Sequence, residues 1–327
     1  MLTYVARRLL RMIPTLIAIS IMVFVIIQLP PGDFFDSLQA QLAESDSQAD
    51  QEAFEALRRQ YHLDLPLWQQ YLYWVSGCVQ GDFGYSFEWR RPVSELIVER
   101  LGLTFLMASG ALFFMWFVAL PIGIYSARNR YSIGDYFLTF LAFIGLCVPG
   151  FIIALVAMYM SVFWFGGSAG GLFSPEFKYA DWSFDRILDL LGHLWVPVVV
   201  IGAAGTASLT RIMRTSMLDV LDEQYITTAR AKGLSERWVI YKYAVRVAIN
   251  PMISILGLQM PQLVSGSIIV AIVLGLPTTG PLFYRALETQ DMYLAGTFLM
   301  LLAILLLLGN LLADILLAWA DPRIRLE

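Results

Sequence analysis

Six long apolar runs limit what this chain can fold into. Each contains about 20 or more mostly apolar residues, the length that an α-helix needs to cross a hydrocarbon layer about 30 Å thick. The runs lie at about 9–29, 101–126, 136–165, 190–210, 248–275 and 293–319. Only 15% of the residues are charged, against about a quarter in soluble proteins. We therefore expect an all-α integral membrane protein with six transmembrane helices.

The first run could be mistaken for a secretory signal, because Arg7, Arg8 and Arg11 surround its start. A signal core has roughly 7 to 15 residues, however, and this run continues to Leu29. The LPPGD that follows is a poor cleavage site, since it lacks the small residues that signal peptidases need. We interpret the run as a retained first helix.

The distribution of charge predicts the orientation, because short cytoplasmic loops carry an excess of Lys and Arg. With the N-terminus inside, the cytoplasmic segments hold 14 of the 22 Lys and Arg residues, and residues 211–246 alone hold 7. The opposite side holds 18 of the 26 acidic residues. The pattern predicts that both termini lie in the cytoplasm.

Three segments follow from this topology. We expect an N-terminal segment with the first helix at 1–29, an external insertion at 30–98, and a core transmembrane domain at 99–327 with a cytoplasmic loop at 211–246. The insertion is predicted to form short helices on the outer membrane surface. Its aromatic residues are either an interfacial belt or a ligand contact. They are Trp68, Tyr71, Tyr73 and Trp74.

Proline and polar residues inside the runs mark further candidates. Pro149 and Gly150 divide a run of about 30 residues and are the strongest hinge candidates. The fifth run carries four polar residues that either line a pore or bond neighbouring helices, and the first two, three residues apart, are expected to share a helix face. The four are Gln259, Gln262, Ser265 and Ser267.

The remaining reactive side chains are isolated. Asp314, near the cytoplasmic end of the sixth run, is predicted to have a structural partner and not to relay protons. His62 and His193 each lack a second ligand at a recognisable spacing, so we expect no metal site. Cys78 and Cys147 lie in such different segments that we expect no disulfide framework.

The cytoplasmic segment from Asp219 to Arg246 has a pattern of its own. Gly233 interrupts a helical spacing and Ser235 can cap the helix that restarts, so the pattern indicates helix, turn, helix. The residues with helical spacing are Leu218, Leu221, Tyr225, Thr228 and Ala229. A short helix at the tip of a membrane bundle can fit a groove on another protein. The alternative is a solvated loop.

These residues resemble a known family. TTARAKG is similar to the EAA motif of ABC importer permeases, with Thr227 in the place of the acid, Thr228 in the place of the first alanine, and Gly233 as the glycine. YITTARAKGLSERWV is closer to the loops of oligopeptide and dipeptide permeases. YVARRLLRMIPTLIAIS, LPPGD, HLDLPLWQQYLYWV, QGDFGYS, RRPVSELIVERL and DPRIRL resemble further signatures of the first permease subunit.

The resemblance implies the type I ABC importer permease fold and a heteromeric importer. Its expected partners are a second homologous permease, two cytoplasmic ABC ATPase subunits, an external solute-binding protein and the lipid bilayer, with no nucleic acid and no cofactor. The residues expected to couple to the ATPase are Asp222, Glu223, Tyr225, Thr227, Thr228, Ala229, Arg230, Lys232 and Gly233. Ala271 stands where peptide permeases carry an acid, so peptides and oligosaccharides both remain possible substrates.

Other classes fit the sequence less well. A P-loop needs a glycine before its lysine, but Lys178, Lys232 and Lys242 follow other residues, so this chain is not expected to hydrolyse ATP. A secondary transporter should show paired charges within its spans, and a membrane enzyme should show a convergent set of reactive side chains. We therefore expect a bacterial inner-membrane permease subunit and not an enzyme.

Overall fold

The computed structural model describes residues 2–29, 64–165 and 170–320. Two compact units are formed by different parts of the chain: residues 1–8, 103–280 and 305–327 form unit 1, and residues 9–102 and 281–304 form unit 2. The long helices α1 (Leu2–Gln28), α5 (Val93–Arg128) and α16 (Met292–Ala320) each contribute to both. The division of the chain expected from the sequence remains a prediction.

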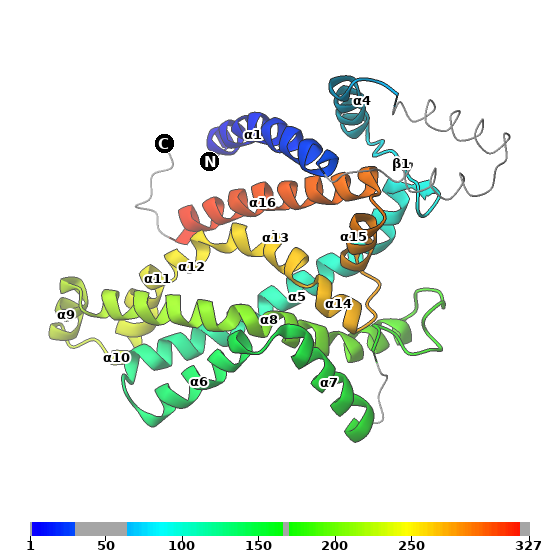
Figure 1. Ribbon diagram of the computed structural model, residues 1–327. Coiled ribbons are helices and arrows are strands. Elements are labelled where there is room, and N and C mark those ends of the chain that lie inside the picture. The colour runs from blue at the N-terminus through cyan, green and yellow to red at the C-terminus, as the bar shows by residue number, and fades with distance from the viewer. Residues whose placement is uncertain (1, 30–63, 166–169, 321–327) are drawn as a thin grey trace, which may run out of the picture. The chain divides into compact units, whose positions relative to one another are not determined.

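The longest helix of unit 1 is α8 (Phe184–Leu221), which contacts most other helices of the unit (Figure 1). The helices α6 (Ile133–Cys147) and α7 (Gly150–Phe165) pack against it. The short helices after the cytoplasmic turn also contact α8, and they are α11 (Val245–Ala248), α12 (Asn250–Ser254), α13 (Leu256–Gly266) and α14 (Ile268–Val273). The buried residues of this core include four methionines, Met115, Met213, Met217 and Met252.

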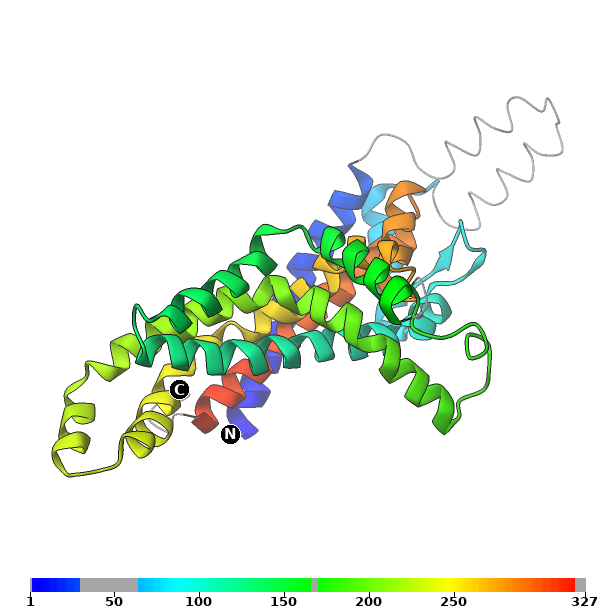
Figure 2. The ribbon, with the colours of Figure 1, turned by 90° about the horizontal axis from the view of Figure 1, so that it is seen from below.

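A sharp break separates α6 from α7, and the two helices meet at 102°. Pro149 lies at the break, where it has no N–H to donate and its ring disfavours a helical conformation in the preceding residue. Val148 is accordingly extended, with φ −89° and ψ 124°. The predicted division of this run at Pro149 and Gly150 is present, and Figure 2 shows the bend from a second side. Its role as a moving hinge stays a prediction.

The predicted membrane spans are confirmed with one change of detail. Five described helices are long and apolar enough to cross a membrane, and the bent pair α6–α7 supplies a sixth span if it is counted as one. In the fifth predicted run, from 248 to 275, the candidate span is Leu256–Val273, which consists of α13 and α14 with a turn at Ser267 between them. Backbone breaks at Ile249 and Ile255 divide its beginning into α11 and α12.

Helices α13 and α16 approach each other closely within unit 1. A Cβ atom built on Gly257 would lie 2.5 Å from the backbone nitrogen of Asn310, and one built on Gly309 would lie 3.0 Å from the Cα of Gly257. Small residues allow transmembrane helices to pack backbone against backbone. These two glycines therefore set the distance between the two helices.

Unit 2 contains α4 (Leu67–Gln80), the hairpin of β1 (Tyr85–Ser86) and β2 (Arg91–Pro92), and α15 (Thr279–Glu288), together with parts of α1, α5 and α16. The hairpin is antiparallel and pairs Tyr85 with Pro92. Its apolar core includes Leu96, Leu282 and Leu294.

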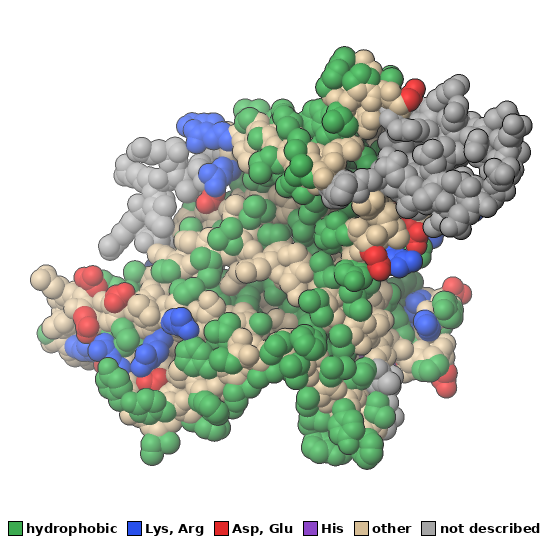
Figure 3. All heavy atoms as spheres, viewed as in Figure 1, with side chains coloured by type: hydrophobic (Ala, Val, Ile, Leu, Met, Phe, Trp, Pro, Cys, Tyr) green, Lys and Arg blue, Asp and Glu red, His purple; other side chains and the backbone are tan. Residues whose placement is uncertain are grey.

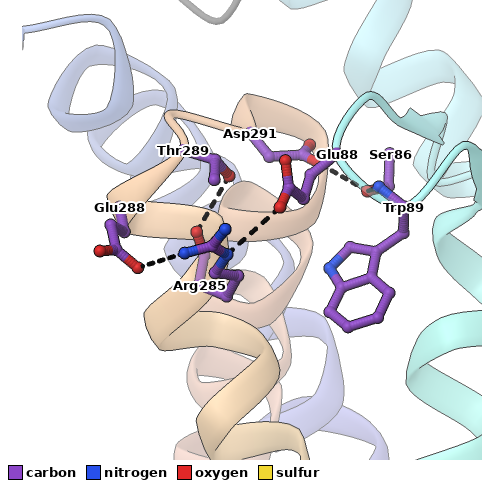
Figure 4. A network of polar contacts seen from close by, with 7 residues as sticks. All are labelled: Ser86, Glu88, Trp89, Arg285, Glu288, Thr289 and Asp291. Atoms are coloured by element: carbon purple, nitrogen blue, oxygen red, sulfur yellow. Dashed lines mark hydrogen bonds and ion pairs between the residues drawn. The ribbon is translucent and has the colours of Figure 1, made fainter.

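A polar network fixes the hairpin of unit 2 to the turn between α15 and α16 (Figure 4). The hydroxyl of Ser86 donates to Oδ2 of the fully buried Asp291, with 2.5 Å between the oxygens. Arg285 lies beside this pair and bonds Glu88 of the hairpin at 3.2 Å and Glu288 at 2.9 Å. Burial raises the pKa of the Asp291 carboxyl above its ordinary value, although the hydrogen bonds from Ser86 and the backbone oppose that rise.

The aromatic cluster predicted near the start of α4 divides into two pairs. Tyr71 lies against Phe24 of α1 with 5.5 Å between ring centroids, and Trp74 is buried. Trp68 and Tyr73 are exposed. Tyr71 and Trp74 therefore pack against α1. For the exposed Trp68 and Tyr73, both predictions remain, a place in the membrane interface or a contact with a ligand. His62 lies outside the described residues.

Candidate functional site

The cytoplasmic candidate site is built around α9 (Gln224–Ala231), which follows α8 after a tight turn. Glu223 precedes the helix with an extended backbone, φ −71° and ψ 145°, and its carbonyl accepts hydrogen bonds from the N–H groups of Ile226 and Thr227. The predicted short helix at the tip of the bundle is therefore present. Figure 1 shows α9 at the end of α8, near α10 (Glu236–Trp238).

Two apolar side chains of α9 pack it against the rest of unit 1. Ile226 is 0% exposed and Ala229 is 6% exposed. They belong to one apolar cluster with residues of α8 and of the π-helix η1 (Val239–Ala244). The other members of this corner include Met217, Val220, Val239 and Ile240. A helix of eight residues is not stable alone, so this anchoring is what keeps α9 folded.

Gly233 ends α9 in the left-handed conformation that the sequence indicates, with φ +77°. Its N–H donates to the carbonyl of Arg230 at 2.9 Å, and the N–H of Leu234 reaches the carbonyl of Ala229 at 3.4 Å. This pair of bonds is the Schellman motif, which satisfies the last carbonyls of a helix. Ser235 stands at the N-cap of α10 as expected, but its side chain makes no capping hydrogen bond.

The rest of α9 is presented to the outside. We call this surface the α9 face and define it by its exposed residues. They are Asp222, Glu223, Gln224, Tyr225, Thr227, Thr228, Arg230, Ala231 and Lys232. Of the residues that the sequence analysis placed at helical spacing, Ala229 is buried, whereas Tyr225 and Thr228 are exposed. Ile226, three residues before Ala229 on the same helix face, was not among them.

Two charges of the α9 face already have partners in this chain. The guanidinium of Arg230 forms a two-point contact with Glu236, at 2.9 Å and 3.2 Å. This contact raises the pKa of Arg230 and lowers the pKa of Glu236. Asp222 lies 3.6 Å from Arg130. Both pairs are exposed, so they orient the side chains more than they stabilise the fold.

Figure 3 shows charged side chains of both signs gathered around α9, while hydrophobic side chains cover α6 and α7. Next to α9, the π-helix η1 places Lys242 over the ring of Trp238, 4.3 Å from its centroid. Single π-helical turns occur often at functional sites. The site holds no group of residues arranged for bond-making chemistry. Its shape suits it to contact another protein.

An ion pair that the sequence analysis missed joins α6 to α8 within unit 1. Arg214 contacts Asp135 with 2.8 Å between Nη2 and Oδ2, and the Asp135 side chain is only 4% exposed. Asp135 also accepts the N–H of Tyr131 at 3.1 Å. Ser132 caps α6 by accepting the N–H of Asp135. A serine followed three residues later by an acid is a capping signal, and it could have drawn attention to Asp135.

The four polar residues predicted on the fifth run have different environments. Gln259 is buried and accepts a hydrogen bond from the indole N–H of Trp116 at 3.2 Å, whereas Gln262 is exposed. Both lie in α13 three residues apart, the spacing that places side chains on one helix face, but they differ in burial. Ser265 donates to the carbonyl of Pro261, and Ser267 donates to that of Val264. Gln259 joins two helices, and a pore-lining role for any of the four stays a prediction.

Asp314 has the structural partner that the sequence analysis favoured. Its Oδ2 lies 2.8 Å from Nη2 of Arg8, although the contact lacks the alignment of a hydrogen bond. Ala271, where the resemblance expects an acid, is fully buried in an apolar cluster with Ala154 and Leu274. A carboxylate at this position would be unpaired and costly to bury.

The chain is similar to known proteins over nearly its whole length. Residues 119–326 match the family described as binding-protein-dependent transport system inner membrane component, and residues 1–108 match the N-terminal part of such membrane components. The oligopeptide transport system permease protein AppB of Bacillus subtilis is 39% identical over 99% of each chain. The glutathione transport system permease protein GsiC of Escherichia coli K12 is 34% identical, also over 99% of each chain.

A solved structure supports the fold. The MetNI methionine ABC transporter in inward-facing form matches with a TM-score of 0.52 and 17% identity, over 69% of this chain and 96% of that one. This likeness shows the type I permease fold predicted from the sequence. With its apolar helices, the chain is a multi-pass protein of the bacterial inner membrane, and it belongs to the family of inner-membrane components of binding-protein-dependent transport systems, the permease subunits of ABC importers.

Proposed function

We propose that this chain is the first permease subunit of a peptide importer, that it forms half of the translocation pore, and that its 219–246 segment couples the pore to an ATPase. The observation that carries the coupling is the construction of α9. Ile226 and Ala229 fix one side of the helix to unit 1, Gly233 ends it, and the α9 face stays exposed.

A rigid connection makes this helix suitable for transmitting movement. Ile226 packs in the same cluster as Met213 and Met217 of α8, so a displacement of α9 is passed to a helix that also spans the membrane. In the proposed cycle, ATP binding closes two ATPase subunits, the α9 face moves with the groove that holds it, and the membrane helices rock as rigid bodies. An external solute-binding protein delivers the substrate.

Peptides are the proposed substrates because the relatives named above are permeases for oligopeptides and for glutathione, which is itself a peptide. The buried Ala271 does not argue against this assignment, since it packs in an apolar cluster of unit 1. Oligosaccharides also remained possible substrates because of Ala271, so the experiment compares a peptide with an oligosaccharide.

Two measurements test the proposal. The tagged chain should co-purify with a second permease and an ATPase, and the assembled transporter should take up trialanine in an ATP-dependent manner when its binding protein is supplied. Maltotriose is the comparison. A chain that purifies alone and transports with an ion gradient would contradict the importer, and ATP-dependent uptake of maltotriose without trialanine would contradict the peptide substrate.

A further inference from the structure

A cavity of about 460 Å³ lies at the N-terminal end of α8, within unit 1. The topology places this end of α8 on the external side. The volume falls in the range of about 300–1,000 Å³ found for ligand pockets. Most of its wall is apolar, and Met158, Trp195 and Leu276 are among the lining residues. Three polar side chains line it, Ser161, Asp189 and His193, and the last two lie next to each other.

The carboxylate of Asp189 is held in a fixed position. Its Oδ2 accepts the backbone N–H of Ser174 at 2.8 Å, and its Oδ1 accepts the Ser174 hydroxyl at 2.6 Å. The side chain is 12% exposed. Nδ1 of His193 lies 3.5 Å from Oδ1 of Asp189, a contact that is an ion pair only when the ring is protonated. Each carboxylate oxygen retains a lone pair that could accept a hydrogen bond from a ligand.

The ring of His193 also presents an acceptor. Its Nδ1 lies 2.8 Å from the backbone carbonyl of Asp189, which can only accept a hydrogen bond. The proton of a neutral ring is therefore assigned to Nδ1, and Nε2 then carries a lone pair. When the His193 ring is neutral, the polar end of the cavity combines the Asp189 carboxylate with the Nε2 acceptor, and the described lining residues include no Lys or Arg.

This combination selects for a cation that can donate several hydrogen bonds. An ammonium group has three N–H donors and a positive charge, whereas a carboxylate would be repelled and a sugar hydroxyl would gain little from the charge. We propose that this cavity binds the terminal ammonium group of the transported peptide, with Asp189 as its counter-charge, His193 Nε2 as an acceptor, and the apolar wall around the first side chains. The inference rests on the proposed peptide substrate.

Matched variants separate this role from a structural one. Asp189→Asn removes the charge but can keep both contacts with Ser174, because the amide oxygen accepts the backbone N–H and the amide nitrogen donates to the hydroxyl. His193→Phe removes Nε2 and keeps a flat ring. Asp185→Asn makes the same change of charge one helical turn earlier, at an exposed residue outside the cavity wall.

The probe is the tripeptide Ala-photoleucine-Ala, photolysed with the assembled transporter in the absence of binding protein. We expect the probe to label Met158 or Trp195. The amount of labelling should fall about tenfold when the probe is N-acetylated and about tenfold in Asp189→Asn. It should also fall in His193→Phe and should not change in Asp185→Asn. Equal labelling by the acetylated probe, or labelling confined to other segments, would overturn the inference.

Uptake of unlabelled trialanine by the wild-type transporter distinguishes the two proposals. If uptake is normal but labelling of the cavity does not depend on the N-terminal charge of the probe, the ammonium site is wrong and the proposed peptide importer is unaffected. If no peptide is transported, the proposed function fails, and the ammonium site fails with it.

Discussion

Arg214 of α8 lies 2.8 Å from Asp135 of α6, measured from Nη2 to Oδ2, although 79 residues separate them in the sequence. The side chain of Asp135 is almost fully buried and that of Arg214 is about one-third exposed. The pair therefore fixes the start of α6 to the cytoplasmic part of α8, the helix that carries α9.

Replacing Asp135 with Asn should destabilise unit 1. The change removes the charge that Arg214 faces, and hydrogen bonds to charged groups contribute about 1.5–3 kcal/mol. Thermal unfolding of the purified transporter measures the loss. Asp222→Asn is the control, because its 3.6 Å contact with Arg130 is exposed and should contribute less than about 1 kcal/mol. Equal losses in the two variants would contradict a structural role for the Asp135 pair.

The stability of unit 2 should depend on pH through the ionisation of Asp291. Burial raises the pKa of this carboxyl from its ordinary value of 3.8, so the folded unit binds a proton more tightly than the unfolded chain. The favourable contribution of Asp291 to the stability of unit 2 is complete below pH 3.8, and it is lost as the pH rises through the raised pKa. Hydrogen exchange of residues 84–92, corrected for the intrinsic rate, should show protection that falls as pH rises.

Two variants check the assignment to Asp291. Asp291→Asn cannot ionise and can still bond Ser86, so the pH dependence should disappear from the hairpin. Asp82→Asn alters an exposed carboxylate just before the same hairpin and should leave the wild-type dependence in place. If Asp291→Asn keeps the wild-type slope, another group is responsible.

The contact between α13 and α16 should not tolerate a methyl group. In Gly257→Ala the new Cβ would press on the backbone nitrogen of Asn310 at 2.5 Å, and overpacking of this kind costs about 1–3 kcal/mol. Gly266→Ala, at the end of the same helix, has no atom within 4 Å of its new Cβ and should be neutral. Thermal unfolding of the two variants compares them directly, and equal stability would show that the helices can separate without cost.

The membrane spans and the end of α9 could be predicted from sequence because each depends on local chemistry. A run of about 20 apolar residues crosses a membrane whatever its neighbours are, and a glycine such as Gly233 adopts a left-handed conformation at little cost. The break at Pro149 follows for the same reason, since proline restricts the residue before it.

The partners of polar residues could not be predicted in this way. Asp135 finds Arg214, and Gln259 finds Trp116, only after helices from distant parts of the chain have packed. The sequence separates Asp189 from Ser174 by a loop, and nothing in either residue type indicates that they meet. Helical spacing also left two faces of α9 possible, and the apolar cluster decided that Ile226 is inside and Tyr225 outside.

The central claim, that α9 transmits movement between an ATPase and the pore, is tested most directly at Gly233. Its φ of +77° costs a residue such as leucine about 1–2 kcal/mol, whereas asparagine tolerates this conformation, and a Cβ added at Gly233 would meet no other atom within 4 Å. The measurement is ATP-dependent uptake and ATPase stimulation by the loaded binding protein, in proteoliposomes containing equal amounts of assembled transporter. We expect Gly233→Leu to insert but to lose both activities at least tenfold, while Gly233→Asn stays near the wild type. Wild-type uptake and stimulation in Gly233→Leu would show that α9 does not transmit the movement.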